Sequence, residues 1–534
     1  MKFDLLFIKR IKAGKALVGS EVRIMLECWF KNSFLYRFTI AMLEIISQSF
    51  FGRLVGKTGT VLVNSKIAYC LRYIASRPYK PENSLFYRIF ERINKKSSVF
   101  RERMFLLLKE SRAYSLLSGS RAFFLVNLFL IPMVALYPFI DELGRELFGW
   151  FPLFGLWDEA YLLISAAYVF LYWFFVKRDR PLVSTPAGAP MLLLMAVSIY
   201  ICLMNSNYPQ LGFEGLRVVI QYLFWFFILN SYLTDDKKAY LVTRLLVYAG
   251  GIMGIHGLIQ YVLKVPTPSN WMDIAEGNTG TRVFSIVESP NVLGSIFILM
   301  IPLCLALVLQ RKRGFTDRLV FFVLLGAMGL SLVLTLSRGA WFGAAIAMGV
   351  FCLAINPRWL FLLGAGGGAM LLVPSVMSRI TYMMSPQYMI SSMTGGRLLR
   401  YQTGWDLFMR HKWTGVGLGH FGGAVAMNNK NLVPDTFYMD NYWLKTAVEM
   451  GIWGIAAFAL LVLFLVFWSI RAIKQSENYD TRLVAAGGFA GLCGVLFHNL
   501  MENIFEVPYM VVYFWTIAAL VFYFGLRRKI EVRG

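Results

Sequence analysis

Long apolar stretches alternate with short polar segments along most of this chain. A helix needs roughly 20 predominantly apolar residues to cross the hydrocarbon of a bilayer. The stretches recur from Ala122 to the C-terminus. They predict an all-α integral membrane protein with about twelve transmembrane helices, at residues 122–140, 157–176, 187–205, 217–233, 240–262, 289–310, 319–336, 341–355, 359–374, 443–470, 483–500 and 508–526.

Basic residues gather in every second connection between these stretches. Cytoplasmic connections of membrane proteins carry an excess of Lys and Arg, so the alternation orients the helices. It predicts a multi-pass topology with both termini in the cytoplasm. The segments that this topology places inside are 177–180, 235–238, 311–313, Arg358, 471–482 and 527–529.

The connection at residues 375–442 is too long to be a simple link between the ninth and tenth stretches. Loops of this length are usually functional or disordered. This one is rich in aromatic residues and has a helical pattern around Leu398–Met409. We therefore expect an ordered, helical outer loop that folds over the membrane surface.

The N-terminal part of the chain differs in composition. Residues 1–120 hold 22 Lys and Arg against 8 Asp and Glu, a net charge of +14. Near anionic lipid, each basic side chain contributes about 1 kcal/mol of attraction. We therefore expect a basic cytoplasmic membrane-surface region at 1–120, with interfacial helices, followed by a polytopic transmembrane domain at 121–534. The charges are scattered and no recognition motif accompanies them, so membrane lipids are expected as partners and nucleic acid is not.

Small and sulfur-containing residues add two expectations. The six cysteines lie in the basic region or in apolar stretches and show no CxxC spacing, which predicts neither disulfides nor a zinc site. Gly364 and residues 366–368 lie inside the ninth stretch. Glycines at such places most often permit close packing of helices.

Four arginines are expected at the outer rim of the membrane, where ionisable side chains are costly and often functional. Guanidinium presents a planar fork of donors that matches phosphate oxygens, so the group suits a diphosphate. The alternative for Arg338 is an arginine that only snorkels to the interface. The alternative for Arg397 and Arg400 is a solvated face of the loop. The four are Arg282, Arg338, Arg397 and Arg400.

Two residues are candidates for a catalytic base. His420 lies in a glycine-rich segment, residues 415–423, and either acts as a base or is a structural, hydrogen-bonded histidine. Asp440 precedes the tenth stretch and either accepts a proton from a sugar hydroxyl or caps the helix that follows. Further ionisable residues at the end of the eleventh stretch would supplement either role: His498, Glu502 and Glu506.

The order of four motifs resembles the O-antigen ligase and polymerase family. The match covers roughly residues 190–525, and its motifs are short but specific in order and spacing. They are Thr335-Leu336-Ser337-Arg338-Gly339-Ala340-Trp341, then Gly396-Arg397 to Trp405, then Gly415-Val416-Gly417-Leu418-Gly419-His420-Phe421, and last Asp440-Asn441-Tyr442-Trp443-Leu444 running to Glu449-Met450-Gly451.

The resemblance implies a glycosyltransferase in the bacterial cytoplasmic (inner) membrane that uses neither a metal nor a cofactor. It would transfer or polymerise a glycan from an undecaprenyl-diphosphate carrier onto an acceptor hydroxyl at the outer face. The four arginines would hold the diphosphate, and Asp440 or His420 would activate the acceptor. In ligases that attach O-antigen to lipid A core, a histidine commonly occupies the position of Asp440. This departure favours a polymerase, or a ligase for another cell-surface glycopolymer.

A polytopic transporter of a polysaccharide or a lipid-linked precursor is the alternative function, because about twelve spans with both ends inside is also a common carrier architecture. Carriers usually place charged residues near the midplane and contain two similar halves. In this sequence the ionisable residues gather at the outer rim and no repeat is visible. The pattern therefore favours an enzyme.

Overall fold

The computed structural model describes residues 85–108, 110–111, 128–175, 185–205, 207–268, 281–434, 436–476 and 478–527. The chain divides into two compact units, Met1–Tyr79 and Lys80–Gly534. The first unit lies outside the described residues, and with it most of the basic region at 1–120. Its expected place on the cytoplasmic membrane surface stays a prediction.

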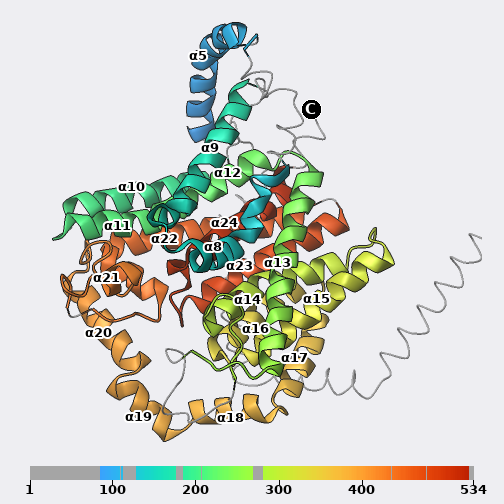
Figure 1. The fold of residues 1–534 in the computed structure, drawn as a ribbon, viewed down its shortest axis with the longest axis vertical. Coiled ribbons are helices and arrows are strands. Elements are labelled where there is room, and N and C mark those ends of the chain that lie inside the picture. The colour runs from blue at the N-terminus through green and yellow to red at the C-terminus, as the bar shows by residue number, and fades with distance from the viewer. Residues whose placement is uncertain are drawn as a thin grey trace, which may run out of the picture. The chain divides into compact units, whose positions relative to one another are not determined.

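Every regular element in the described part of the chain is a helix (Figure 1). The longer helices are α5 (Leu85–Leu108), α8 (Tyr137–Phe148), α9 (Trp157–Phe175), α10 (Gly188–Met204), α11 (Pro209–Ile220), α12 (Phe224–Tyr232), α13 (Asp236–Val262), α14 (Pro290–Val308), α15 (Phe315–Leu334), α16 (Arg338–Ile355), α17 (Trp359–Met370), α18 (Pro374–Met383), α19 (Pro386–Thr394), α20 (Arg397–Arg410), α21 (Ala424–Asn428), α22 (Tyr442–Gln475), α23 (Tyr479–His498) and α24 (Pro508–Phe522). Short turns of other helix types are η2 (Pro132–Leu136), η3 (Pro152–Leu156), η4 (Gln221–Leu223), η7 (Ile504–Glu506) and η8 (Tyr523–Arg527).

Nine helices among the described residues are long and apolar enough to cross a membrane, and two shorter apolar helices, α10 and α17, accompany them. The all-α membrane class is thus confirmed, whereas the count of about twelve spans is not. At 1.5 Å per residue, the 12 residues of α17 reach only about 18 Å, because Pro374 already begins the next helix. The first predicted span is not one helix in its described part, since Pro132 opens a 3₁₀ turn and α8 follows it.

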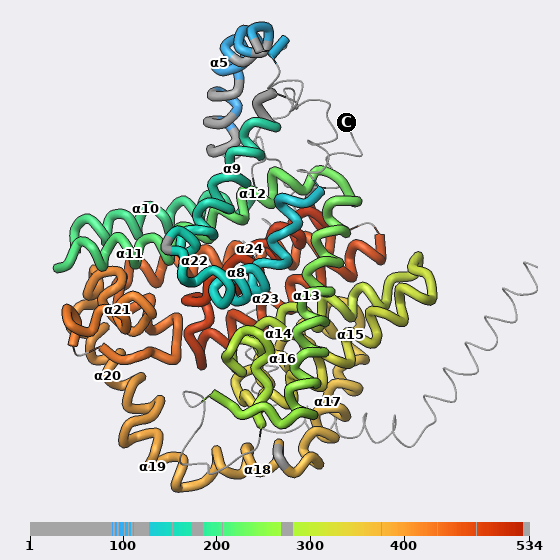
Figure 2. The backbone as a smooth tube through the Cα atoms, viewed as in Figure 1, coloured from blue at the N-terminus to red at the C-terminus, as the bar shows by residue number. Residues whose placement is uncertain are grey.

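The centre of the bundle is formed by α14, α23 and α24, whose residues are almost all buried. Glycines on α23 let it approach α14 closely: a methyl group on Gly487 would lie 2.5 Å from the Pro302 carbonyl oxygen, and one on Gly491 would lie 2.8 Å from that of Leu299. Close backbone approach of this kind is how helices associate where lipid removes the hydrophobic driving force. Around this core, α10 packs against both α11 and α22 (Figure 2).

The charged connections that the sequence placed on one side do meet at one end of the bundle. Asp480 accepts hydrogen bonds from the backbone N–H of Arg311, at 2.9 Å, and of Lys312. Arg482 donates to the Ala354 carbonyl at the end of α16. The connections at 311–312, directly after α16 and at 480–482 therefore lie at the same end of the bundle.

The long connection at 375–442 contains helices, as predicted. Its α18, α19 and α20 follow one another along one edge of the bundle (Figure 2), and α21 comes before the return to α22. The predicted helix around Leu398–Met409 is α20, Arg397–Arg410. It carries two of the four predicted arginines into the site described next.

Candidate functional site

Two arginines of α20 pair with the aspartate that precedes α22. Arg397 and Arg400 lie on the same face of the helix because they are three residues apart. Arg400 Nη1 donates to Asp440 Oδ2 at 2.8 Å, and Arg397 Nε lies 3.6 Å from the same oxygen. Tyr401 fixes the segment further, since its hydroxyl donates to the Asp440 carbonyl at 2.9 Å. The outer-loop helix is thereby attached to the start of α22.

The helix cap of α22 is Asn441, not Asp440. The Asn441 side chain accepts the Leu444 N–H at 3.0 Å. The capping alternative for Asp440 is therefore wrong, and its carboxylate is available for other contacts. Oδ2 is taken by the two arginines, while Oδ1 makes no hydrogen bond within the described part of the chain.

A second carboxylate extends this network to α14 and to the loop before it. Glu502, just after α23, forms an ion pair with Arg397 and accepts from Asn291 Nδ2 at 2.8 Å. The side-chain oxygen Oδ1 of Asn291 accepts from Arg282 Nη2 at 3.4 Å. Arg282, Asn291, Glu502, Arg397 and Asp440 thus form one chain of polar contacts, and all except Arg397 are buried.

Arg338 and a fifth arginine surround the turn between α15 and α16. Leu336 in this turn has a positive φ of 52°, which is uncommon for a leucine and is found mainly at functional sites. The turn exposes two carbonyls to arginines: that of Thr335 to Arg282 Nε at 3.0 Å, and that of Leu336 to Arg379 Nη1 at 3.1 Å.

Arg338 begins α16 beside this turn. Its guanidinium donates to the Arg379 carbonyl at 3.4 Å and lies 5.0 Å from the centre of the Tyr388 ring. We call Arg282, Arg338, Arg379, Arg397 and Arg400 the arginine cluster. Five guanidinium groups face two carboxylates, Asp440 and Glu502, so the cluster has a surplus of positive charge that suits an anionic group.

Burial and charge perturb the ionisation of these groups. Burial raises the pKa of Glu502 to about 7, although Arg397 acts in the opposite direction. The two carboxylates raise the pKa of Arg397 above its ordinary value in spite of its burial. The pKa of Tyr401 rises to about 12, mainly through burial. Perturbed groups of this kind gather at functional sites more often than elsewhere.

His420 lies apart from the arginine cluster. Its Nε2 accepts the Tyr208 N–H at 3.3 Å, and Nδ1 lies 2.8 Å from the Leu418 carbonyl, to which it donates in the matching tautomer. Both ring nitrogens are thus occupied by backbone groups. This is the geometry of the structural alternative, and no contact joins the ring to Asp440 within the described residues.

The glycine-rich segment docks on a break in α22, which the sequence analysis did not predict. Gly415, Gly417, Gly419 and Gly422 all have positive φ, a conformation that glycine adopts without strain. Gly451 interrupts α22 with φ 63°, and this frees two carbonyls: those of Val448 and Glu449 accept from Val416 N and Gly417 N at 2.9 and 3.0 Å. Two motifs of the sequence thus bind each other through their backbones.

A buried ion cluster holds the same segment from below. Lys445 Nζ lies 2.6 Å from Glu449 and 2.7 Å from Glu506. The second oxygens of these carboxylates accept from Phe421 N at 3.3 Å and Ala424 N at 3.0 Å. Lys445 pairs with both carboxylates, and each carboxylate also accepts a backbone N–H of the loop, so the cluster fixes the position of the loop.

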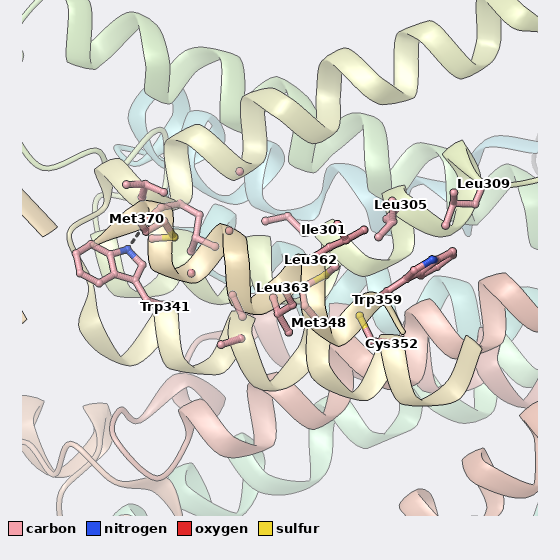
Figure 3. A pocket seen from close by; sticks show the side chains of 17 residues that line it. Ile301, Leu305, Leu309, Trp341, Met348, Cys352, Trp359, Leu362, Leu363 and Met370 are labelled. Atoms are coloured by element: carbon pink, nitrogen blue, oxygen red, sulfur yellow. Dashed lines mark hydrogen bonds between the residues drawn. The ribbon is translucent and has the colours of Figure 1, made fainter. Parts of the chain in front are cut away.

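An apolar cavity of about 660 Å³ extends beneath Arg338, between α14, α15, α16 and α17. Trp341, one turn after Arg338, lies at one end near Met370, and Leu309 and Cys352 lie at the other (Figure 3). Gly366 and Gly367 line it, and a methyl group on either would meet nothing within 4 Å. The prediction that these glycines allow close helix packing is therefore wrong, because they leave space instead.

The structure joins most of the predicted residues and adds others. Arg282, Arg397, Arg400 and Asp440 belong to one network, Arg338 adjoins it, and His420 does not. Glu502 was only a supplementary candidate, and Arg379 had no signal beyond its charge in the outer loop. Of the other supplementary residues, His498 bonds Ser295 at 2.7 Å. Among the described residues no group of three or more His, Cys, Asp or Glu is placed to hold a metal ion.

Comparison with known proteins gives a family match, which covers much of the arginine cluster. Residues 321–459 match the family described as O-antigen ligase. This segment contains Arg338, Arg379, Arg397, Arg400 and Asp440, whereas Arg282 and Glu502 lie outside it. No curated protein matches the chain. This match over residues 321–459 supports glycan transfer of the O-antigen ligase or polymerase type for the part of the chain that carries most of the arginine cluster.

Proposed function

We propose that this protein transfers a glycan from an undecaprenyl-diphosphate carrier to an acceptor hydroxyl at the outer face of the bacterial cytoplasmic membrane. The observation that carries the proposal is the arginine cluster, in which Arg397 is shared by two buried carboxylates. A diphosphate would exchange with these carboxylates as the partner of the guanidinium groups. Arginine suits this exchange because its fork of donors fits phosphate oxygens in pairs.

The apolar cavity supports the same carrier. It begins one helical turn below Arg338 and is lined almost entirely by apolar side chains. A polyprenyl chain attached to a diphosphate at the arginine cluster would lie in it, and the open glycine face of α17 gives the chain room. Head group and tail would then be recognised by adjacent parts of α16.

In the proposed reaction the acceptor hydroxyl attacks the anomeric carbon of the donor sugar. The bond from this carbon to the diphosphate oxygen breaks, undecaprenyl diphosphate leaves with the electron pair, and the hydroxyl proton passes to Asp440 Oδ1. The arginines stabilise the charge that develops on the leaving oxygens, a contribution of roughly 3 kcal/mol for a well-placed donor in other enzymes. His420 remains the second candidate for the base.

The test is reconstitution of the purified protein with an undecaprenyl-diphosphate-linked oligosaccharide and a glycan acceptor. New glycosidic linkage, seen as a ligated or lengthened product by mass spectrometry, is the expected result. Movement of the lipid-linked glycan across the bilayer without new linkage would instead show a transporter. Product length separates the two enzymatic forms, because a ligase adds one unit and a polymerase adds many.

A further inference from the structure

A polar pocket, separate from the apolar cavity, lies at the end of the bundle opposite to the arginine cluster. It has a volume of about 320 Å³ and is formed by the first turns of α13, the connection between α14 and α15, and the connection between α22 and α23. Three cationic side chains line it: Arg244, Lys312 and Arg313. The proposed glycan transfer makes no use of it.

Arg313 is held in this pocket with part of its donor capacity unused. Its side chain is 4% exposed, and its Nε and Nη2 both donate to Gln310 Oε1, at 3.2 and 2.6 Å. The guanidinium lies 4.8 Å from the centre of the Phe321 ring. Its Nη1 has no hydrogen-bond partner in the described part of the chain, and Asp317 Oδ2 is 3.6 Å away. A buried donor without a partner is costly.

Two exposed cations lie beside it. Arg244 is part of the membrane-spanning helix α13, two turns after its start, and neither its guanidinium nor the Lys312 ammonium has an ion pair or hydrogen bond to the described residues. An unpaired charge at such a depth is a functional candidate by default. Burial, followed by the nearby Arg244, lowers the pKa of Arg313, whereas Asp317 acts in the opposite direction.

Three carboxylates also line the pocket, Asp236, Asp317 and Asp480, and two of them accept hydrogen bonds from other groups. Both oxygens of Asp480 accept backbone N–H groups, and Asp236 accepts from the Tyr523 hydroxyl at 3.1 Å. Asp317 alone faces Arg313. The N-terminus of α15 adds to the attraction for anions, because its cap residue Gly314 lines the pocket and has no side chain to bond the first amides.

We propose that this pocket binds a phosphate group, presented by the head group of an anionic phospholipid or by free phosphate. Arg244 and Lys312 would contact its oxygens directly, and buried Arg313 would contribute its charge from behind. Basic pockets between transmembrane helices at the cytoplasmic side are known to take lipid head groups in other proteins. The proposal does not depend on the reaction at the arginine cluster.

The experiment titrates the full-length protein in neutral detergent with two probes, dioctanoyl phosphatidylglycerol and inorganic phosphate, and follows the thermal unfolding midpoint. A ligand that binds only the folded state raises this midpoint in a saturable manner. Arg244→Gln should weaken binding roughly tenfold, since one charge-assisted contact is lost. Asp317→Asn should strengthen binding, because it removes the remaining carboxylate.

Two controls make the result specific. Arg358→Gln removes an exposed arginine outside the pocket and should leave binding unchanged. Arg400→Gln, in the arginine cluster, weakens any phosphate binding at that end, so the response that this variant retains and Arg244→Gln loses belongs to this pocket. A response to phosphatidylglycerol alone identifies a lipid, and one to inorganic phosphate identifies the free anion. No saturable response to either probe, or equal responses in wild type and Arg244→Gln, would overturn the proposal.

Discussion

At the scale of single residues, the site is an arrangement of arginines kept in place by carboxylates. Arg397 and Arg400 would repel each other if left alone, and Asp440 and Glu502 balance them before any substrate arrives. Donors already fixed in position need little reorganisation when charge develops, which is why such groups are effective in catalysis. The chemistry expected of the site can be tested one residue at a time.

Asp440→Asn should lower the rate of glycan transfer by about 10² to 10⁴, because an amide does not accept a proton at neutral pH. The matched control is Asn441→Ala, which removes the observed cap of α22. It should cost about 1 kcal/mol of stability and spare the chemistry. Both variants are compared by initial rate and by thermal midpoint. If Asp440→Asn is fully active while His420→Ala is inactive and folded, His420 is the base.

Arg338→Ala should abolish transfer while the protein stays folded, and Arg338→Lys should restore only part of it, since ammonium lacks the bidentate fork. Initial rates with the lipid-linked donor measure this. Arg358→Ala, an exposed arginine at the other end of the bundle, is the control and should keep full activity. Normal rates for Arg338→Ala would show that this side chain only anchors the helix at the interface.

Glu502 gives the stability of the protein a defined dependence on pH. Its folded-state pKa is raised to about 7 from an ordinary value of 4.5, so the folded state binds more protons than the unfolded state between these values. This proton binding stabilises the folded state fully below pH 4.5, and the stabilisation is lost as the pH rises through 7. Relative to wild type, Glu502→Gln should therefore be more stable at pH 8 than at pH 5. A difference in thermal midpoint that is equal at both values would refute the raised pKa.

At the scale of elements, the break in α22 joins the outer loop to the membrane bundle. A continuous helix would use the carbonyls of Val448 and Glu449 internally. Gly451 prevents this, and residues 412–417 take those bonds, with Ile452 N donating to the Lys412 carbonyl at 2.7 Å in return. The loop is thus held by backbone hydrogen bonds that replace those lost from α22 at Gly451.

Gly451→Ala should lower the stability of the protein strongly. A methyl group there would lie 2.3 Å from the Trp413 carbonyl oxygen, at a φ of 63°, and the backbone strain alone costs of order 1–3 kcal/mol. Gly364→Ala is the matched control, because a methyl group on it would meet nothing within 4 Å. The thermal midpoint should fall for the first variant and stay the same or rise for the second. Equal midpoints would mean that the close approach is not present in solution.

At the scale of the whole molecule, the two ends of the bundle have different chemistry. One end carries the arginine cluster, assembled from residues between Arg282 and Glu502. The other carries the basic connections and the polar pocket. The positive-inside rule predicts that the second end, which carries the basic connections, faces the cytoplasm.

This orientation can be measured by labelling in whole cells. A cysteine at exposed position Lys430, in the outer loop, should react with a membrane-impermeant maleimide from outside. A cysteine at exposed Arg358, between α16 and α17, should react only after the membrane is opened. The native cysteines in the described residues are buried or partly buried, and wild type provides the background. The reverse pattern would place the arginine cluster in the cytoplasm and exclude the proposed reaction.

Much of this protein followed from sequence because membrane folding obeys local rules. Lipid requires apolar helices of a given length, and the distribution of Lys and Arg orients them. The helical class, the common end of the connections at 311–312 and 480–482, and the helix with Arg397 and Arg400 were therefore predictable. The predictions that failed concern helices that contain prolines and glycines or lie next to them. Helix α17 is shorter than the predicted span, and the first predicted span is broken at Pro132.

The composition of the site was decided by the tertiary structure. Arg397 lies 105 residues from Glu502 in sequence, and no local pattern pairs them. In the same way, the glycine-rich motif made His420 a candidate base. Only the structure shows that its two ring nitrogens contact Tyr208 N and the Leu418 carbonyl. The sequence by itself determined which helices form and which end of the bundle is basic, because these depend on neighbours along the chain. Which charges are paired, and which remain available for a ligand, depends on contacts between distant segments, and only the packed bundle decided that.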